Sequence, residues 1–525
     1  MNSHKTSVLR GTVMLAALVL FSVVLPAQES SGTASSDSAR AVQDLQDQVG
    51  QLRTLVEQMR AENAESRAEM RRLRQDLQAT RALLEKSPTQ PAESSSEAAS
   101  GQPRSTTPGQ ETSAGGSVLQ DRVQRLEEST SLLGSKIDEQ YQTKVETASK
   151  YRARLHGIVL MNAFRNNGGS DNLDLPTYAE AGSAGSPNAT AGATLRQSEI
   201  GLEIFGPTLG GAKTSADVQL DFSGGFPATG NGVNFGVVRL QTASVRFDWE
   251  HTSVVAGQDS LFISPLSPTS FASLAIPTFA FAGNLWGWTP QLRLEHRFSI
   301  SDQQTIVVQG GVMDNLDWEY PYNSFYRAAQ AGEFSGQPAY AFRTEWSRLV
   351  QGHPLSVGAA GYYGRQAWSW GRNVDAWAGM ADWRIPILPR LSLSGEFYRG
   401  RGIGGLGGGI GTSILYGGNT PYSPIRGLDA AGGWAQLKFQ ATPKLEFNGV
   451  IAEDDAFASD VRGFATDQNN FGPILGRNRG AMGNVIYRPR SDLILAAELK
   501  RLRTFPVYSN SSLTNQLNLS VGILF

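Results

Sequence analysis

The chain has 525 residues, a formal net charge of -2 at pH 7, 57 glycines and no cysteine. So balanced a charge gives no reason to expect nucleic acid as a partner. A chain without cysteine has no disulfides, no thiolate metal ligands and no lipid-anchored N-terminal cysteine. After the N-terminus, no apolar run reaches the roughly 18 residues of a membrane-spanning helix. A membrane β-barrel stays possible, because its strands need only every second residue to be apolar.

The N-terminal segment, residues 1–27, is typical of a secretory signal peptide. Lys5 and Arg10 give a positively charged start, residues 13–25 form an apolar core, and Ala27 offers a small residue before a cleavage point. A membrane anchor is the alternative, but the apolar core is shorter than the roughly 20 residues that a spanning helix needs. We therefore expect an exported protein.

Residues 28–85 are predicted to form a coiled coil. Apolar residues recur there at alternating steps of three and four, which places a hydrophobic seam along a long helix. The seam begins with Val42, Leu45, Val49, Leu52, Val56 and Met59. Residues 86–117 are rich in Ser, Pro, Gly and Thr and are expected to be a flexible linker, and residues 118–150 carry a second, shorter coiled-coil seam. The alternative is a long solvated helix that packs elsewhere.

From residue 151 onward the apolar period falls from about 3.5 to about 2, which predicts strands with one polar and one apolar face. Arg293, Glu295 and Arg297, for example, alternate with Leu292 and Leu294. The sixteen candidate strands are 152–165, 194–205, 212–224, 236–249, 251–258, 289–300, 304–314, 337–349, 354–366, 374–384, 389–401, 431–441, 443–453, 480–488, 491–502 and 514–525.

The connections between the candidate strands alternate in length. Connections after odd-numbered strands are mostly long, such as 166–193 and 402–430, whereas those after even-numbered strands are tight turns such as 301–303. Bacterial outer-membrane barrels have long loops at one rim and short turns at the other, and a soluble β-sandwich has no reason to segregate loop lengths. We therefore predict an all-β fold over residues 151–525, a 16-stranded antiparallel transmembrane β-barrel that follows an N-terminal α-helical coiled coil.

The last candidate strand ends in an aromatic residue. Leu517, Leu519, Val521 and Ile523 alternate with other residues and lead to Phe525. This pattern resembles the closing-strand signal of outer-membrane barrels, so Phe525 is expected to be an assembly signal that the barrel assembly machinery reads.

No constellation of catalytic, metal-binding or cofactor-binding residues stands out, so we expect neither an enzyme nor a bound cofactor. The glycine run at 401–409 lacks the strand, helix and Lys-Ser/Thr of a phosphate-binding loop and is expected to be a flexible external loop. The five histidines have no metal-ligand spacing. The acidic cluster at 453–455 is expected to lie in a solvated loop or to contact surface lipid through divalent cations.

Strand parity indicates which charged residues face the lumen, because an Arg or Lys that faces lipid at mid-membrane costs about 2–4 kcal/mol. The expected pore-lining residues are Arg246, Arg293, Glu295, Arg297, Arg343, Glu345, Lys438, Glu498 and Lys500. An alternative is that these charges only pair with one another and hold the wall together. From position 152 onward, 25 of the 29 basic residues are arginine, and arginine binds carboxylate or phosphate with two parallel bonds, which favours anionic solutes.

The connection 259–288 is expected to fold into the lumen and to form the constriction. Its aromatic residues would make an exposed apolar patch if the loop lay in water. These aromatic residues include Phe262, Phe271, Phe279 and Trp286. Packing against the inner wall would bury them, and Asp259 would then face Arg293 and Arg297 across the narrowest point. The alternative is that the aromatic residues form a contact between copies or cap the barrel from outside.

Three segments resemble the DcaP-like porins, namely residues 196–202 (RQSEIGL), 218–224 (VQLDFSG) and 255–262 (VAGQDSLF). That family has an early strand of the type RQSR-x-G, an acidic third strand, and a GQ-x-W-x-x-F segment that enters a long loop. Here Glu199 replaces the second arginine and Ser260 the tryptophan. The resemblance implies a trimeric, sixteen-stranded diffusion channel for small, often anionic solutes, in which the third long loop narrows the pore as in general porins.

These observations predict an outer-membrane porin, a passive diffusion channel for small hydrophilic solutes that include anions. Its expected partners are outer-membrane lipid, small-molecule solutes, the barrel assembly machinery and further copies of itself in a homotrimer. The expected location is the bacterial outer membrane, with the N-terminal region in the periplasm. The main alternative is an outer-membrane anchor or tether whose coiled coil contacts the periplasm or cell wall. A trimeric autotransporter adhesin also joins a coiled coil to a barrel, but each of its chains supplies only a few strands.

Overall fold

The structure is a computed structural model that describes residues 144–145, 152–182, 185, 187–225, 236–315, 317, 327–350, 352–418, 420, 422–462, 464 and 473–525. The expected signal peptide, first coiled coil and linker lie outside these residues. Of the second coiled-coil segment only Lys144–Val145 is described, and it forms the two-residue strand β1. Within the described ranges, no helix is long and apolar enough to cross a bilayer.

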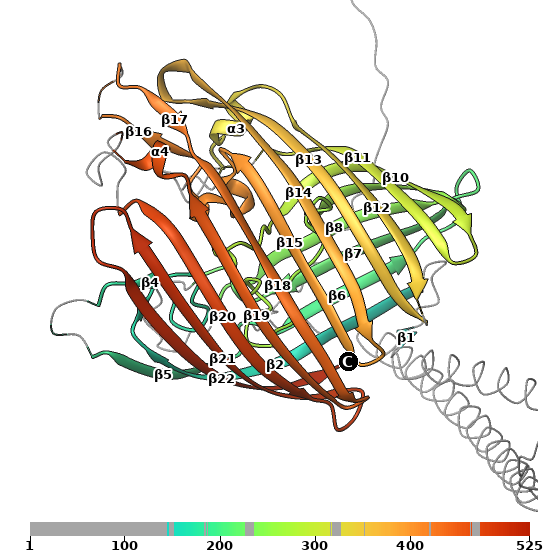
Figure 1. Cartoon of the computed structure of the whole chain (residues 1–525). Coiled ribbons are helices and arrows are strands. Elements are labelled where there is room, and N and C mark those ends of the chain that lie inside the picture. The colour runs from blue at the N-terminus through green and yellow to red at the C-terminus, as the bar shows by residue number, and fades with distance from the viewer. Residues whose placement is uncertain are drawn as a thin grey trace, which may run out of the picture. The chain divides into compact units, whose positions relative to one another are not determined.

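The described strands form a closed antiparallel barrel (Figure 1). The main sheet has 18 strands, and 16 remain in the ring when the short strands β1 and β5 (Ala189–Thr194) are set aside. The ring consists of β2 (Arg152–Asn167), β6 (Glu199–Phe205), β7 (Lys213–Asp221), β8 (Arg239–Asp248), β9 (Thr252–Ser260), β10 (Trp288–Ser301), β11 (Gln304–Met313), β12 (Ala339–Val350), β13 (His353–Trp368), β14 (Arg372–Leu388), β15 (Leu391–Arg401), β18 (Asp429–Thr442), β19 (Leu445–Ala456), β20 (Leu475–Tyr487), β21 (Leu493–Pro506) and β22 (Ser512–Leu524). Because β22 pairs back with β2, the main sheet of the described residues closes on itself, which confirms the sixteen-stranded barrel.

The connections alternate in length around the ring. At one rim, which we call the short-turn rim, neighbouring strands are joined by turns such as 302–303 and 389–390. The opposite rim, the long-loop rim, holds the longer connections and most of their short elements (Figure 1). The short elements of the long connections are β3 (Gly169–Ser170), β4 (Ala179–Glu180), α3 (Ala331–Phe334), η1 (Ser369–Gly371), η2 (Gly404–Leu406), η3 (Gly409–Gly411), β16 (Ile414–Tyr416), β17 (Ile425–Gly427) and α4 (Ala458–Val461).

The register of the strands decides which side chains point into the barrel. In β10, Arg293 lies opposite Val255 of β9 and Gly311 of β11, so these three residues point the same way. Their neighbours Leu292 and Leu294 point outward, and 52% and 51% of their surface is exposed. The same parity repeated around the ring gives an outward face rich in exposed Leu, Ile, Val and Phe, while Asn, Gln, Ser and charged residues are buried inside. Such a wall is apolar outside and polar inside, as a barrel in lipid requires.

The seam between the first and last strands of the ring includes the C-terminal residue. The backbone N–H of Gly157 donates to the carbonyl of Phe525 at 3.0 Å, and the N–H of Phe525 donates back to Gly157 at 3.1 Å. A Cβ at position 157 would lie 2.8 Å from the Phe525 ring and 2.3 Å from the backbone oxygen of Glu199. Position 157 of β2 therefore requires glycine, because a larger residue would clash with the aromatic ring of Phe525 and with the backbone of β6.

Candidate functional site

The connection between β9 and β10, residues 261–287, runs through the interior of the barrel, and we call it the inner loop. Its first part bonds to strands on the opposite side of the ring from β9. Ser264 Oγ and the Leu266 N–H both donate to the carboxylate of Glu396 on β15, at 2.5 and 2.7 Å. The Thr269 N–H donates to Gln436 Oε1 on β18 at 2.7 Å.

The middle of the inner loop, residues 270–275, is held by side chains from the remaining wall. Glu498 of β21 accepts a bond from a loop serine at 2.6 Å, and Asn162 of β2 and Arg239 of β8 donate to loop carbonyls at 2.8 and 2.6 Å. Gln197, which precedes β6, bonds to two backbone groups of the loop at 3.0 and 2.8 Å. The inner loop is thus bonded to strands around most of the barrel wall.

The apolar side chains of the inner loop pack against inward residues of the wall. Of the four aromatic residues named above for this loop, Phe262, Phe279 and Trp286 are buried, with 3–6% of their surface exposed, and Phe271 is partly buried. Phe262 packs with inward residues of β11 to β15 such as Met313, Tyr362 and Tyr398. Phe279 packs with Trp434, Val450 and Met482 of β18 to β20. Burial inside the barrel removes these side chains from water.

The inner loop reverses direction at two strained residues. Phe279 and Phe281 have φ values of 64° and 60°, in the left-handed region that residues other than glycine rarely adopt. The ring of Phe279 occupies the space where a side chain at position 480 would stand, since a Cβ on Gly480 would lie 2.1 Å from it. Packing of the Phe279 ring over Gly480 of β20 stabilises the left-handed backbone conformation of Phe279.

The glycine run 401–409 was expected to be a flexible external loop, and that expectation is wrong. Ile403 and Leu406 are buried in the same interior cluster as Phe262 of the inner loop, and Ile410 is buried as well. The N–H of Trp286 in the inner loop donates to the Leu406 carbonyl at 3.0 Å. Glycine allows this close packing, because a Cβ at Gly404 would lie only 2.5 Å from a neighbouring backbone nitrogen.

A short break interrupts the strand predicted over 194–205, because residues 195–198 turn away from the ladder between β5 and β6. Arg196 is buried there and pairs with Asp174 of the first long connection; its Nε donates to Asp174 at 2.6 Å. Asp171 lies in the same connection and accepts bonds from Thr177 and Tyr178. Burial raises the pKa of Asp171, although these bonds act in the opposite direction.

Three of the expected pore-lining residues form a chain of alternating charges with Asp259 on β8 to β10. Asp259 binds Arg293 at 2.8 Å, Arg293 binds Glu295 at 2.9 Å, and Glu295 binds Arg246 at 3.0 Å. We expected Asp259 to face Arg293 and Arg297 across the narrowest point of the lumen, but the structure does not place it there. It belongs to β9 and lies opposite Thr289 on the adjacent strand β10, so the contact runs along the wall.

The inner loop covers other residues that were expected to line the pore. Glu498 and Lys500 point into the barrel, but each has only 3% of its surface exposed, and the Lys500 ammonium donates to Ser273 of the loop at 2.6 Å. Arg343 is buried too and binds Asp382 at 2.8 Å and Glu345 at 2.5 Å. Glu498 and Lys500 thus join the loop to the wall, whereas Arg343 joins strands β12 and β14 of the wall.

Two expected lumen residues are more accessible. Arg297 donates to Ser253 at 3.0 Å and remains partly exposed. Lys438 lies 3.4 Å from the carboxylate of Glu446. Both point inward in the half of the barrel near the short-turn rim, where the inner loop leaves room.

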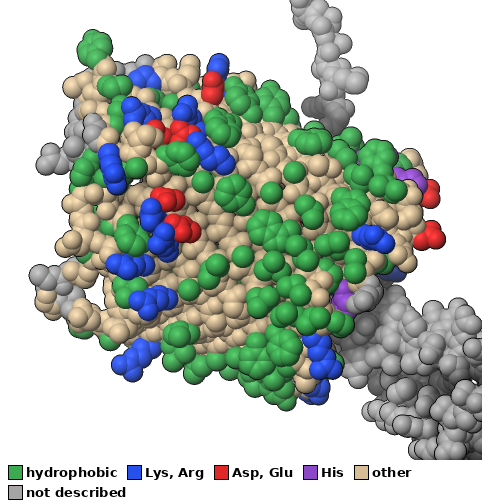
Figure 2. Space-filling model, viewed as in Figure 1, with side chains coloured by type: hydrophobic (Ala, Val, Ile, Leu, Met, Phe, Trp, Pro, Cys, Tyr) green, Lys and Arg blue, Asp and Glu red, His purple; other side chains and the backbone are tan. Residues whose placement is uncertain are grey.

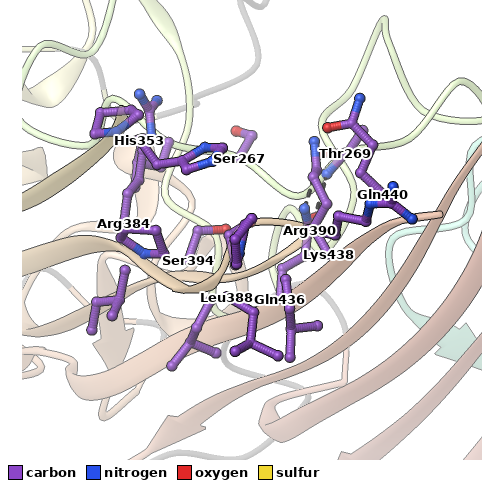
Figure 3. A pocket seen from close by; sticks show the side chains of 18 of the residues that line it. Ser267, Thr269, His353, Arg384, Leu388, Arg390, Ser394, Gln436, Lys438 and Gln440 are labelled. Atoms are coloured by element: carbon purple, nitrogen blue, oxygen red, sulfur yellow. Dashed lines mark hydrogen bonds between the residues drawn. The ribbon is translucent and has the colours of Figure 1, made fainter. Parts of the chain in front are cut away.

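A cavity of about 350 Å³ lies beneath the inner loop on the side of the short-turn rim. Residues 265–267 and Thr269 of the loop form part of its lining, and β13, β14, β15, β18 and the turn 389–390 supply the rest. Figure 3 shows His353 and Arg384 at one side of this space and Arg390 and Lys438 at the other. No carboxylate is among the described residues that line it. Arg384, Arg390 and Lys438 therefore give the described lining of this cavity a positive charge.

Sequence reasoning missed both the wall residues that hold the inner loop and the basic residues of this cavity. Glu396 and Gln436 stand at inward positions of their strands, so strand parity could have placed them inside. Arg384 has the same parity as the inward Asp382 and could have been found in the same way. The loop residues that Glu396 and Gln436 bind could not have been found from the sequence, because these contacts join residues more than 100 positions apart.

The acidic cluster 453–455 lies in strand β19 and not in a solvated loop, which corrects that part of our expectation. Asp454 points inward and is fully buried, where it accepts a bond from the Ile410 N–H at 3.0 Å. Glu453 and Asp455 point outward and pair with arginines of β20. Across the ranges that the structure describes, no three His, Asp or Glu side chains are grouped so that they could hold a metal ion.

The chain matches no known protein-family model and no curated protein. Solved structures do match it. The outer membrane channel DcaP of Acinetobacter baumannii is similar, with a TM-score of 0.53 and 15% sequence identity over 72% of this chain and 99% of that one. The fold is similar to that of an outer-membrane channel.

Two further solved structures match with lower TM-scores. The anion-selective porin from Comamonas acidovorans has a TM-score of 0.44 and 13% identity, over 72% of this chain and all of that one. OprB of Pseudomonas putida has a TM-score of 0.43 and 15% identity, over 70% of this chain and 94% of that one. At such identities the likeness to DcaP concerns the fold, and it confirms at that level the resemblance to the DcaP-like porins.

Proposed function

We propose that the protein is a porin of the bacterial outer membrane, a passive channel for small hydrophilic solutes. The observation that supports this most strongly is the distribution of side chains on a closed wall, with apolar residues outward, polar residues inward and no free sheet edge. Such a wall satisfies every backbone group while it faces lipid. The inner loop crosses the interior and is bonded to strands around most of the wall, and we propose that it forms the constriction.

We further propose a homotrimer. The outward positions of β6 to β9 carry no charged residue, and exposed apolar residues such as Ile200, Leu202, Leu240 and Val245 cover them. An uncharged face of this kind can be buried against a second barrel at little electrostatic cost. The coiled coil predicted in the N-terminal region would bring the chains together in addition.

Recordings from planar lipid bilayers test both proposals. The purified protein is expected to produce stepwise increases in ion current, and the current should be linear in voltage. The channels of one inserted trimer should close in three equal steps, because the three barrels act independently. A protein that inserts but passes no current would contradict the channel, and the anchor or tether would then be the better reading. Single-step insertions, together with the native mass of one chain in mild detergent, would contradict the trimer.

Selectivity for anions is proposed from the basic cavity. Replacing Arg384 and Arg390 together by glutamine removes two positive charges from a space whose described lining has no carboxylate. We expect the reversal potential in a salt gradient to shift toward cation preference, while the conductance changes less than twofold. The control is Arg348→Gln, because Arg348 lies on β12 at an outward position near the short-turn rim. Equal reversal potentials in all three proteins would show that these arginines do not set the selectivity.

A further inference from the structure

The outward face of the barrel changes character along β19, β20 and β21. Toward the short-turn rim its residues are apolar, as with Leu495 and Leu499 of β21, which are 37% and 59% exposed. Toward the long-loop rim the same face carries arginines. Four of them, which we call the arginine patch, are Arg477, Arg479, Arg501 and Arg503. Figure 2 shows Lys and Arg side chains, with a few acidic ones, gathered on part of this face while hydrophobic side chains cover much of the rest.

Strand register brings the arginine patch together. Arg479 of β20 lies directly opposite Arg503 of β21, and Arg477 lies opposite Phe505. Arg501 is two residues before Arg503 on the same face, about 7 Å along the strand. Like charges directly opposite each other on a sheet are destabilising. The pair Arg479 and Arg503 is therefore unfavourable unless anions lie close to it.

Within the ranges that the structure describes, two carboxylates pair with the arginine patch. Glu453 lies 3.0 Å from Arg479, and Asp455 lies 3.0 Å from Arg477. Four arginines thus face two carboxylates. The Arg503 guanidinium lies 3.2 Å from the Ser511 hydroxyl and 5.0 Å from the centre of the Phe505 ring, and it has no ion pair within the described part of the chain. Arg501 pairs with its neighbouring strands through its backbone, but its guanidinium forms no hydrogen bond or ion pair with the side chains or backbone of the described residues.

An aromatic ring keeps the arginine patch in place. The guanidinium groups of Arg477, Arg479 and Arg503 lie 5.9, 6.0 and 5.0 Å from the centre of the Phe505 ring. Contacts of this kind attract cations to the ring face. They limit the directions in which the three side chains can point. The side chains would therefore lose less conformational entropy when an anion binds.

A groove of about 500 Å³ opens on the outward side of β15, β18 and β19, next to the arginine patch. Phe397 and Ile451 stand at its sides, and the small residues Ala431, Gly433 and Ala435 lie between them. Glu453 belongs both to the lining of this groove and to the ion pair with Arg479. An apolar channel on the lipid side therefore leads to a group of arginines.

We propose that the arginine patch binds the phosphate groups of an anionic lipid, one acyl chain of which lies in the neighbouring groove. Arginine binds phosphate with two parallel hydrogen bonds, and the patch borders the apolar band, at the level where lipid headgroups lie. Glu453 and Asp455 orient the two inner arginines and leave Arg501 and Arg503 for the ligand. The inference rests on the proposed location in the outer membrane.

Native mass spectrometry of the full chain in mild detergent tests this inference. The probes are lipid A with two phosphates and the same lipid after removal of both phosphates. We expect the phosphorylated form to bind and Arg501→Gln with Arg503→Gln to weaken its binding about tenfold. Ala435→Leu, which fills the groove without changing a charge, is expected to weaken binding of the same probe. Arg348→Gln, at the other rim, serves as the control and should bind as the unmodified protein does.

Several outcomes would overturn the inference. Equal binding of both lipids, or unchanged binding by the double arginine variant, would show that phosphate is not recognised there. Displacement of the lipid by millimolar inorganic phosphate would indicate a site for free anions. A change in the number of copies with lipid binding retained would make the patch an interface between copies. Channel currents in bilayers without lipid A depend only on the proposed function, so they separate its failure from that of the lipid site.

Discussion

Deletion of residues 266–282 from the inner loop is expected to raise the single-channel conductance severalfold and to weaken ion selectivity. These residues carry the bonds to Gln436, Glu498 and Lys500, and their removal would open the interior between the two sides of the wall. The two arms of the loop lie side by side, because Ser264 Oγ lies 3.1 Å from the Leu285 carbonyl oxygen. A short glycine linker can therefore join them.

The deletion needs a control that leaves the inner loop in place. Ser264→Ala removes one of many bonds to the wall and should leave the conductance unchanged. Heat-modifiable bands on gels would establish that each variant has folded. If the deleted protein folds but conducts like the unmodified one, the narrowest point of the channel lies elsewhere, and the two other segments inside the barrel, the first long connection and the glycine run, become the candidates.

Removal of Phe525 is expected to reduce the folded protein in the outer membrane at least tenfold while export from the cytoplasm continues. The residue supplies both hydrogen bonds with Gly157 at the end of the seam and a ring for which the glycine leaves room. The predicted signal peptide lies at the other end of the chain, so the two steps should separate. Fractionation of cells followed by gels with unheated samples measures both.

Substitution of the same residue provides the comparison. Phe525→Tyr keeps the aromatic ring and both backbone bonds, and it should assemble nearly as well as the unmodified chain. Normal amounts of heat-modifiable protein in the outer membrane after the deletion would show that the last residue is no assembly signal. Loss of the exported precursor would instead point to a defect in an earlier step.

Strand positions and the direction of side chains could be predicted from the sequence because both depend on neighbouring residues. The alternation of polar and apolar residues that placed Leu292 and Leu294 outside can be recognised within a stretch of a few neighbouring residues. The break at 195–198 escaped this reasoning, since it depends on the buried pair of Arg196 with Asp174. A pattern of period 2 carries no sign of such a partner.

The filling of the interior could not be predicted, because its contacts join distant parts of the chain. Parity placed Glu498 and Lys500 inside, but their cover comes from a loop more than 200 positions earlier. The glycine run was misread for a different reason. Glycine suits a mobile loop and tight packing equally well, and only the neighbours Ile403 and Leu406 in the interior cluster distinguish the two.

The bonds of the inner loop to β20, β21 and β22 have a consequence for the order of folding. The loop precedes these strands by about half of the barrel, and Ser270 and Glu498 are separated by 228 positions. Contacts between such distant positions form late and slowly. Once β22 has joined β2, the loop can no longer enter from the side. Either the loop enters later through the long-loop rim, or it already lies within the curved sheet when the last strands arrive. We expect the second order, in which the barrel closes around its own contents, because the loop then meets β20 to β22 as they are added.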